Sequence, residues 1–215
     1  HRPLWSIIND LLPDAGTSNP STNPAVQRLL TLPFVVTEDL FAVTINQSYT
    51  APAGLDAGRI AALLPRLAIA SSLLAGFPKI TRLIKQLHLG AVVSHVSEMC
   101  KSEPVEDVIA VAPKELRDLY SLFADLDHQS AVEKTIYQQL RGLPIWQSSR
   151  GLVKATQALL PGNFSDPTGQ ADLLDVSVLT ESARDFLTSK LGVQTQTIEA
   201  FVQTVLPTFF DNDGP

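Results

Sequence analysis

The chain has 215 residues, of which 45% are hydrophobic and 18% are charged, a composition that is typical of globular proteins and excludes a disordered chain. Its formal net charge is −6 and its Lys and Arg residues occur singly. We therefore expect no nucleic-acid partner, because nucleic-acid-binding proteins carry clustered basic residues. The single cysteine, Cys100, excludes an internal disulfide, and we expect a cytoplasmic location.

The longest apolar stretch, residues 60–77, is interrupted by Pro65 and Arg66. It lacks the roughly 18 charge-poor residues of a membrane-spanning helix, so we expect a buried helix that is kinked or split at the proline, and no membrane contact. The sequence begins without an initiator Met, and we interpret it as a fragment of a longer protein.

The N-terminal part predicts two helices and a hairpin. Residues 4–12 have apolar spacings of three and four, which predict an amphipathic helix that buries Leu4, Ile7, Ile8, Leu11 and Leu12. Residues 13–24 are rich in Pro, Ser, Thr and Asn and predict a loop, and Pro24 suits the first turn of a short helix. Residues 32–45 contain two β-branched and aromatic runs around a turn at 37–39, which predicts a β-hairpin.

The middle of the chain predicts mainly helices. Residues 79–87 place four apolar side chains on one face of a short helix. Its basic residues are expected on a solvated face: Lys79, Arg82 and Lys85. Residues 91–100 fit a helix or a strand, and residues 108–111 predict a buried strand. Two more helices are expected, one from Pro113 and one over residues 130–140.

A second predicted hairpin repeats the outline of the first. Its strands are expected at residues 143–146 and 151–155, and its Leu-Pro pair matches the pair at residues 32–33. In both hairpins eight positions separate the proline from the first apolar residue of the returning strand, and a helix that closes on Gly76 or Gly192 follows. We predict a degenerate internal duplication, although such pairs and glycines are common enough to align by chance.

The C-terminal segments have clear local signals. Residues 159–167 predict a turn-rich loop, and residues 172–176 a short buried run between carboxylates. Thr180 is the expected N-cap of a helix whose apolar face consists of Ala183, Phe186, Leu187 and Leu191. Gly192 is the expected left-handed residue after it. A last amphipathic helix is expected to bury Ile198, Phe201, Val202 and Val205.

Five segments of the second half carry a family resemblance: Leu143-Pro144-Ile145-Trp146, Gly151-Leu152-Val153-Lys154, Leu159-Leu160-Pro161, Asp172-Leu173-Leu174-Asp175-Val176 and Phe186-Leu187-x-x-x-Leu191-Gly192-Val193. Together they resemble the repeat regions of sacsin-like proteins, which are very large intracellular proteins. The resemblance covers residues 140–205 and reaches the earlier half only through the internal repeat.

In the sacsin-like family a chaperone-type ATPase module precedes long repeat regions, which are regarded as scaffold or as client-contacting surface. The present chain lacks the nucleotide site of that module, because it has no Asn-bearing helix paired with Asp-x-Gly-x-Gly and no glycine-rich lid. The resemblance therefore implies a segment that lies outside the ATPase module.

Local motifs for catalysis or metal binding are absent: the sequence has no G-x-S-x-G, no H-E-x-x-H, no paired cysteines and no P-loop. His88 and His95 are two helical turns apart and could share a metal with Cys100 or Glu98, but Gly90 interrupts the span and no fourth ligand is placed. We expect Cys100 to be a small buried hydrophobe. The prediction is no catalytic residue, no cofactor and no metal.

Three aromatic residues are the candidate interaction residues: Trp5, Trp146 and Phe164. The alternative for the two tryptophans is a place in the core, where large aromatic side chains usually lie. For Trp146 the apolar density of residues 143–146 favours this structural role.

The sequence predicts an α+β fold, mostly helical with short β-hairpins or small mixed sheets. Two subdomains are expected at residues 1–110 and 111–215, either separate or packed as one domain. The expected function is a non-catalytic protein-interaction or scaffold module of a larger sacsin-like, chaperone-type protein, whose partner is a protein or another domain of the parent chain. Two alternatives stay open: an enzyme with catalytic residues on scattered loops, and a regulatory or effector domain with an exposed apolar binding patch.

Overall fold

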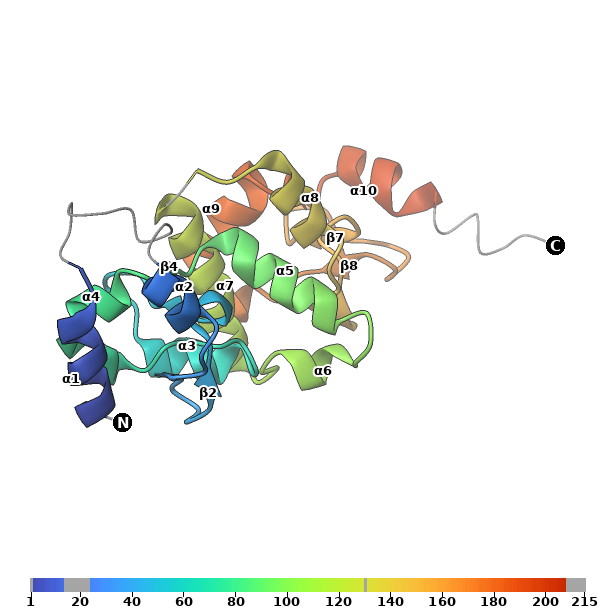
Figure 1. The fold of residues 1–215 in the computed structure, drawn as a ribbon. Coiled ribbons are helices and arrows are strands. Elements are labelled where there is room, and N and C mark those ends of the chain that lie inside the picture. The colour runs from blue at the N-terminus through green and yellow to red at the C-terminus, as the bar shows by residue number, and fades with distance from the viewer. Residues whose placement is uncertain (1, 14–23, 130, 208–215) are drawn as a thin grey trace. The chain divides into compact units, whose positions relative to one another are not determined.

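The computed structural model describes residues 2–13, 24–129 and 131–207 (Figure 1). The chain divides into two compact units, residues 1–88 and 89–215, so the division falls earlier than the predicted boundary after residue 110. Helices predominate and the strands are short, which confirms the predicted α+β class. Within the described ranges, no helix combines the length and the apolar character needed to cross a lipid bilayer.

The first unit is built from short helices and two-residue strands. Its elements are α1 (Arg2–Leu11), α2 (Pro24–Leu30), β1 (Val35–Val36), β2 (Ala42–Val43), the 3-10 helix η2 (Ile45–Gln47), β3 (Tyr49–Thr50), α3 (Ala57–Leu63), the 3-10 helix η3 (Ser72–Gly76), α4 (Pro78–Thr81) and β4 (Lys85–Gln86). β1 and β2 form the predicted antiparallel hairpin. β3 and β4 form a parallel pair that was not predicted.

The first helix, α1, buries a different face from the predicted one. Trp5 is fully buried, its ring lies 5.7 Å from the ring of Phe77, and its indole Nε1 donates a hydrogen bond to Phe34 O at 3.0 Å. Three side chains of the predicted buried face are exposed instead: Leu4, Ile7 and Leu11. Burial of a tryptophan with its N–H satisfied removes more apolar surface from water than burial of a leucine, so Trp5 determines the orientation of α1.

Two of the three basic residues predicted on a solvated face also hold the end of α1: Arg82 is exposed as predicted, and Lys79 is half-buried. Lys79 Nζ donates a hydrogen bond to Leu12 O, and Arg82 Nη2 donates one to Pro13 O, both at 2.9 Å. The last carbonyl groups of a helix have no partner within the helix, and cations near them interact favourably with the helix dipole. These bonds fasten α1 to α4, beside which it lies (Figure 1).

The apolar stretch from residue 60 to residue 77 forms two helices, as its proline indicated. α3 ends at Leu63, and η3 ends at Gly76. Between them Ile69 and Ala70 are extended and bridge to Tyr49 and Thr37. The predicted helix over residues 79–87 was wrong beyond Thr81, because the chain leaves α4 to pair with β3 as strand β4.

The second unit contains longer helices and a three-stranded parallel sheet. Its elements are α5 (Leu89–Met99), α6 (Val105–Val108), α7 (Pro113–Gln129), α8 (Lys134–Arg141), β5 (Trp146–Ser148), β6 (Gly151–Val153), β7 (Ala158–Leu160), β8 (Asp172–Leu173), the 3-10 helix η4 (Val176–Val178), α9 (Glu181–Ser189), β9 (Gln194–Thr195) and α10 (Ile198–Thr204). β5 and β6 form the second predicted hairpin, and β7 lies at the centre of the sheet β8-β7-β9.

Three predictions for this unit were wrong. Residues 108–111 form no strand, because Val108 ends α6. Residues 158–160 form the central strand β7, whereas residues 159–167 were assigned to a loop. α10 leaves Ile198 and Val202 exposed and packs through the adjacent face. The buried residues of that face are Ala200, Phe201 and Val205.

The predicted helix signals around α9 are confirmed. Thr180 Oγ1 accepts a hydrogen bond from Ala183 N at 3.3 Å, as an N-cap side chain does. Gly192 has φ +66°, the left-handed conformation that glycine adopts without strain. Leu191 and Phe186 are buried, so the predicted apolar face packs as expected.

The two units share one order of strand pairings, as the predicted repeat requires. The end of the first hairpin strand, at Thr37 or Ser148, bridges to an extended segment at Ala70 or Leu174. In the first unit β3 runs parallel to the last strand β4, and in the second unit β7 runs parallel to the last strand β9. Two hydrogen bonds of the first unit have an equivalent in the second. Ser71 N donates to Val36 O as Asp175 N donates to Gln147 O, both at 2.9 Å. Leu87 N donates to Thr50 O at 2.9 Å as Gln196 N donates to Leu160 O at 2.8 Å. By this equivalence Leu87 of the first unit corresponds to Gln196 of the second.

Candidate functional site

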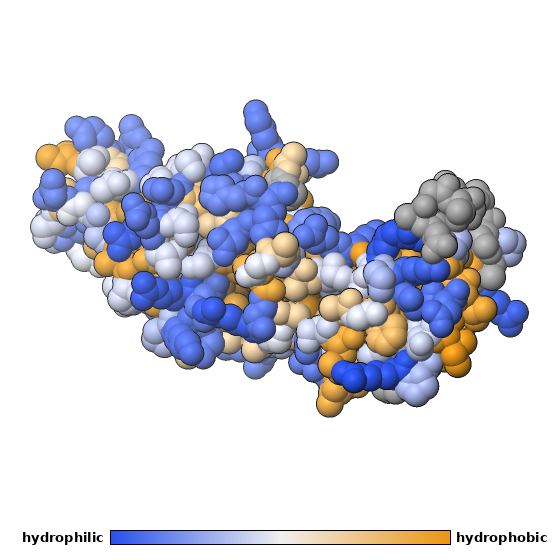
Figure 2. All heavy atoms as spheres, turned by 90° about the vertical axis from the view of Figure 1, so that its left-hand side faces the viewer, coloured by the Kyte–Doolittle hydropathy of each residue, from blue (hydrophilic) through white to orange (hydrophobic). Residues whose placement is uncertain are grey.

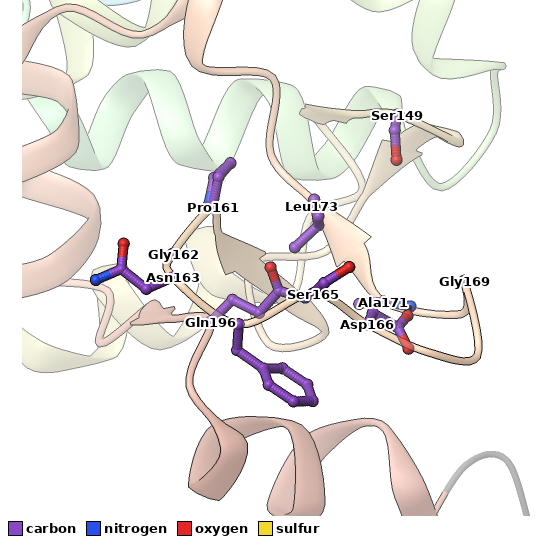
Figure 3. A pocket seen from close by; sticks show the side chains of 11 residues that line it. Ser149, Pro161, Gly162, Asn163, Ser165, Asp166, Gly169, Ala171, Leu173 and Gln196 are labelled. Atoms are coloured by element: carbon purple, nitrogen blue, oxygen red, sulfur yellow. Dashed lines mark hydrogen bonds between the residues drawn. The ribbon is translucent and has the colours of Figure 1, made fainter.

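A groove lies at one edge of the parallel sheet of the second unit (Figure 3). β7 and β9 run parallel, so their carboxyl ends meet at the same edge. The loop of residues 161–171 leaves β7 there, and Gln196 follows β9 directly. In open parallel sheets this edge is the usual place for a binding site, because the loops that leave the strands converge on it.

The groove consists of two adjoining hollows of about 520 and 510 Å³. Both hollows are lined by Pro161, Gly162, Asn163, Phe164 and Gln196. From these shared residues the first hollow extends to Ser149 and Asp166, and the second extends to Ile198 and Glu199. Both hollows are open to solvent, which suits an extended chain better than a compact ligand that binds in an enclosed cavity.

Gly162 is required where the loop passes the end of β9. A β-carbon at this position would lie 2.2 Å from Gln196 O and 2.9 Å from Thr195 Cγ2. Real side chains do not reach such distances, so only glycine permits this close approach of the two backbones. The approach sets Asn163 and Phe164 against Gln196.

Asp166 organises the rest of the loop. Its carboxylate accepts hydrogen bonds from Thr168 N at 2.7 Å, Thr168 Oγ1 at 2.6 Å and Ala171 N at 2.7 Å. Burial raises the pKa of the Asp166 carboxyl, but the hydrogen bonds from Thr168 and Ala171 outweigh it and lower the pKa overall. The carboxylate is therefore charged at neutral pH, and its hydrogen bonds hold the loop.

The floor of the groove is apolar. The Phe164 ring lies 5.3 Å from the ring of Phe201 on α10. Both rings belong to a cluster with Leu159, Ala171 and Val205. Phe164 is partly buried, so one part of its ring supports the cluster and the other part faces the groove.

Gln196 is the unusual residue of the site. Its side chain is 3% exposed, and its Nε2 has no hydrogen-bond partner in the part of the chain that the structure describes. In Figure 3 the side chain extends among Gly162, Asn163 and Ser165, at the inner wall of the groove. An unpaired buried amide costs about 1–3 kcal/mol, and the equivalent position of the first unit holds the buried Leu87, which carries no such cost.

Among the described residues, the lining of both hollows contains no Lys, Arg, His or Cys. An anionic ligand would find no counter-charge there, and no residue of the lining is a nucleophile paired with a base. The groups that face the groove are an aromatic ring, aliphatic side chains, hydroxyls, amides and two carboxylates. The Asp166 carboxylate is held by hydrogen bonds within its own loop, and Glu199 is exposed at the rim. This is the chemistry that binds an uncharged, partly apolar chain with hydrogen-bonding peptide groups.

The structure separates the three candidate interaction residues. Trp5 and Trp146 are buried, and both act as core residues rather than as surface anchors. Phe164 alone lies at the groove. The signals in the sequence that could have found the site are Gly162 and the turn-rich loop around it. Gln196 has no local signal, because its role depends on the strand pairing that brings it to the loop.

Trp146 fills the space between the second hairpin and α7. It is 1% exposed, and its ring lies 4.9 Å from Tyr120 and 5.8 Å from Phe123. Tyr120 fixes the strand by donating a hydrogen bond to Ile145 O at 2.8 Å and accepting one from Gln147 N at 2.9 Å. Burial raises the pKa of the Tyr120 phenol, so it stays protonated as a donor.

The other chemically interesting side chains have structural roles. No group of three His, Cys, Asp or Glu residues within the described ranges could hold a metal ion. Burial raises the pKa of the Cys100 thiol, which makes it a poorer nucleophile. Asp127 is buried and accepts a hydrogen bond from Tyr137, while Lys190 Nζ lies 3.3 Å from its other carboxylate oxygen, so the trio joins α7, α8 and the end of α9.

No family model, curated protein or solved structure matches the chain.

Proposed function

We propose that the chain is a non-catalytic protein-interaction module, a scaffold segment of a larger sacsin-like, chaperone-type protein. Its groove holds an extended, uncharged and partly apolar segment of a protein partner or of another domain of the parent chain. A cytoplasmic location suits this role, and the single free thiol of Cys100 is in keeping with it.

The observation that carries the proposal is the amide of Gln196. A buried polar group without a partner destabilises the fold, and the repeat contains an apolar solution at the same position, Leu87. Such a group is explained if a ligand supplies the missing partner. The terminal torsion of a glutamine is broad, so the amide turns at little cost to meet the carbonyl of a bound peptide.

The floor and the rim of the groove support the same kind of ligand. Phe164 and Leu173 offer apolar contact to alternate side chains of an extended segment. Asn163 and Ser165 offer hydrogen bonds to its main chain. The ligand gains apolar burial from the floor and hydrogen bonds from the rim, the combination found in peptide-binding grooves.

The test is a titration of the isotope-labelled protein with ten-residue peptides that are capped at both ends. One set combines Leu and Phe with Ser and Asn, and a matched set replaces the polar residues with Lys or Glu. We expect the uncharged set to shift the backbone amide signals of residues 161–166 and 194–197. The Glu set should bind at least tenfold more weakly, because the groove lining offers it no cation and its charges would be desolvated. The Lys set should bind less weakly than the Glu set, because Glu199 lies at the rim.

The decisive variant is Gln196→Leu, which installs the residue of the first repeat. We expect it to keep or raise the melting temperature and to weaken peptide binding at least tenfold. Val202→Ala, on the exposed face of α10 and outside the groove lining, is the matched control that should bind like the wild type. Undiminished binding by Gln196→Leu would contradict the proposal, as would the absence of amide shifts at the groove with every peptide.

A further inference from the structure

The tip of the first hairpin, residues 38–41, exposes two large apolar side chains in the first unit. Leu40 is 82% exposed and Phe41 is 69% exposed. Figure 2 faces the side on which α1 and α4 lie in Figure 1, and hydrophobic side chains reach the surface there among hydrophilic ones. Single exposed apolar residues are common, but two adjacent ones at a turn, where polar residues are usual, are not.

The conformation of Leu40 makes the tip more unusual. Its φ is +65°, in the left-handed region that leucine rarely adopts. Three-residue hairpin turns place their last residue in this region and favour glycine there. The fold therefore tolerates a strained backbone in order to present an apolar side chain that contributes nothing to the core.

The second hairpin shows that the extra residue is not needed to close the turn. Its strands are joined through residues 149 and 150 only, between the paired Ser148 and Gly151. The first hairpin has three residues between the equivalent positions, since Thr37 N donates to Phe41 O at 2.9 Å. The turn of the first hairpin is therefore one residue longer than that of the second. Leu40 is the residue of this longer turn whose backbone is strained.

The tip is acidic as well as apolar. Asp39 is exposed, and the Glu38 carboxylate accepts a hydrogen bond from Ser72 N at 2.5 Å, which fixes the tip against η3. The same bond brings the tip beside residue 73, the exposed Leu73. The first unit carries seven Lys or Arg residues against five Asp or Glu residues, so two of its few carboxylates lie at this tip.

We propose that the tip is a docking element that inserts Leu40 and Phe41 into an apolar pocket of a partner protein whose rim carries Lys or Arg. The apolar side chains lose their contact with water in the pocket, and the basic rim pairs with Asp39 and the remaining carboxylate oxygens. This surface is separate from the groove of the second unit, so either proposal can fail without the other.

The experiment selects partners from a displayed library of a small helical scaffold whose binding face is randomised. Clones are collected that bind the wild-type protein and fail to bind Leu40→Gly. Glycine relieves the left-handed backbone, so this variant should melt no lower than the wild type, and any loss of binding then reports the missing side chain. The control is Leu11→Gln, which removes an apolar side chain of similar exposure, 79%, from α1.

We expect the selected clones to be enriched in apolar and basic residues over acidic ones. Their affinity should fall at least tenfold with Leu40→Gly and with Phe41→Ser, fall with added salt, and stay unchanged with Leu11→Gln. The proposal is overturned if no clone distinguishes Leu40→Gly, or if the distinguishing clones are acidic or lack charge. It is also overturned if the wild type self-associates in sedimentation velocity and Leu40→Gly does not, because the occupant would then be a second copy of the chain.

Discussion

Truncation of Trp146 to alanine should destabilise the second unit strongly. The side chain is 1% exposed and packs against Tyr120 and Phe123, so its removal leaves a cavity in the middle of the packing between the hairpin and α7. Removal of a fully buried tryptophan typically costs about 3–5 kcal/mol, a large share of the roughly 5–15 kcal/mol that stabilises a domain. For a chain of this length each kcal/mol lowers the melting temperature by about 2–4 °C.

The conservative variant Trp146→Phe should behave very differently. The indole Nε1 is buried and has no hydrogen-bond partner among the described residues. Phenylalanine removes that unpaired donor, a gain of about 1–3 kcal/mol, and this gain offsets part of the cost of the smaller ring. We expect the free energy of unfolding of Trp146→Phe to lie within about 1.5 kcal/mol of the wild-type value.

Urea denaturation followed by far-ultraviolet circular dichroism measures both variants, because tryptophan fluorescence would lose one of its two sources. A loss below about 1.5 kcal/mol for Trp146→Ala would refute the reasoning, since it would mean that the site collapses without a cavity or that the ring is exposed in solution. A loss as large for Trp146→Phe as for Trp146→Ala would show that the indole N–H has a partner after all.

Two further changes test the groove edge and the helix junction. Gly162→Ala should lower the free energy of unfolding by about 1–3 kcal/mol in urea denaturation, because its β-carbon would meet Gln196 O at 2.2 Å; a neutral result would mean that the loop is free to move away. Burial, followed by the hydrogen bond to Asp127 and its charge, raises the pKa of Tyr137 from its ordinary value of 10.0 to about 12. The phenol bond therefore stabilises the fold fully below pH 10 and is lost as the pH rises towards 12, so the stability of Tyr137→Phe should change less over that interval than that of the wild type. Absorbance at the tyrosinate band should show one fewer late-titrating phenol in the variant, and an unchanged titration curve would contradict this assignment.

Both proposed binding surfaces lie at places where the two repeats differ. Gln196 replaces a buried leucine of the first repeat, and the strained Leu40 belongs to a turn that is longer than that of the second repeat. Both residues make the fold less stable than the alternative that the other repeat contains. Such local departures from the best folding solution are typical of functional positions.

Local signals in the sequence determined much of the second unit. The N-cap at Thr180, the left-handed Gly192 and the apolar face of α9 were all predicted, because a helix end is specified by a few adjacent residues. The two hairpins were predicted for the same reason, since each turn and both strands lie within about a dozen residues of sequence. The burial of Trp146 followed from the apolar density around it.

Tertiary structure decided what these local signals cannot contain. The parallel pairs β3–β4 and β7–β9 join strands of two or three residues that are far apart in the sequence. Strands this short have no periodic pattern and no stability without their partners. The groove depends on the second of these pairs, because only that pairing brings Gln196 to the loop after β7. The orientation of α1 was decided in the same way: its apolar face is wide, and the space available for Trp5 beside Phe34 selected the side of that face that is buried.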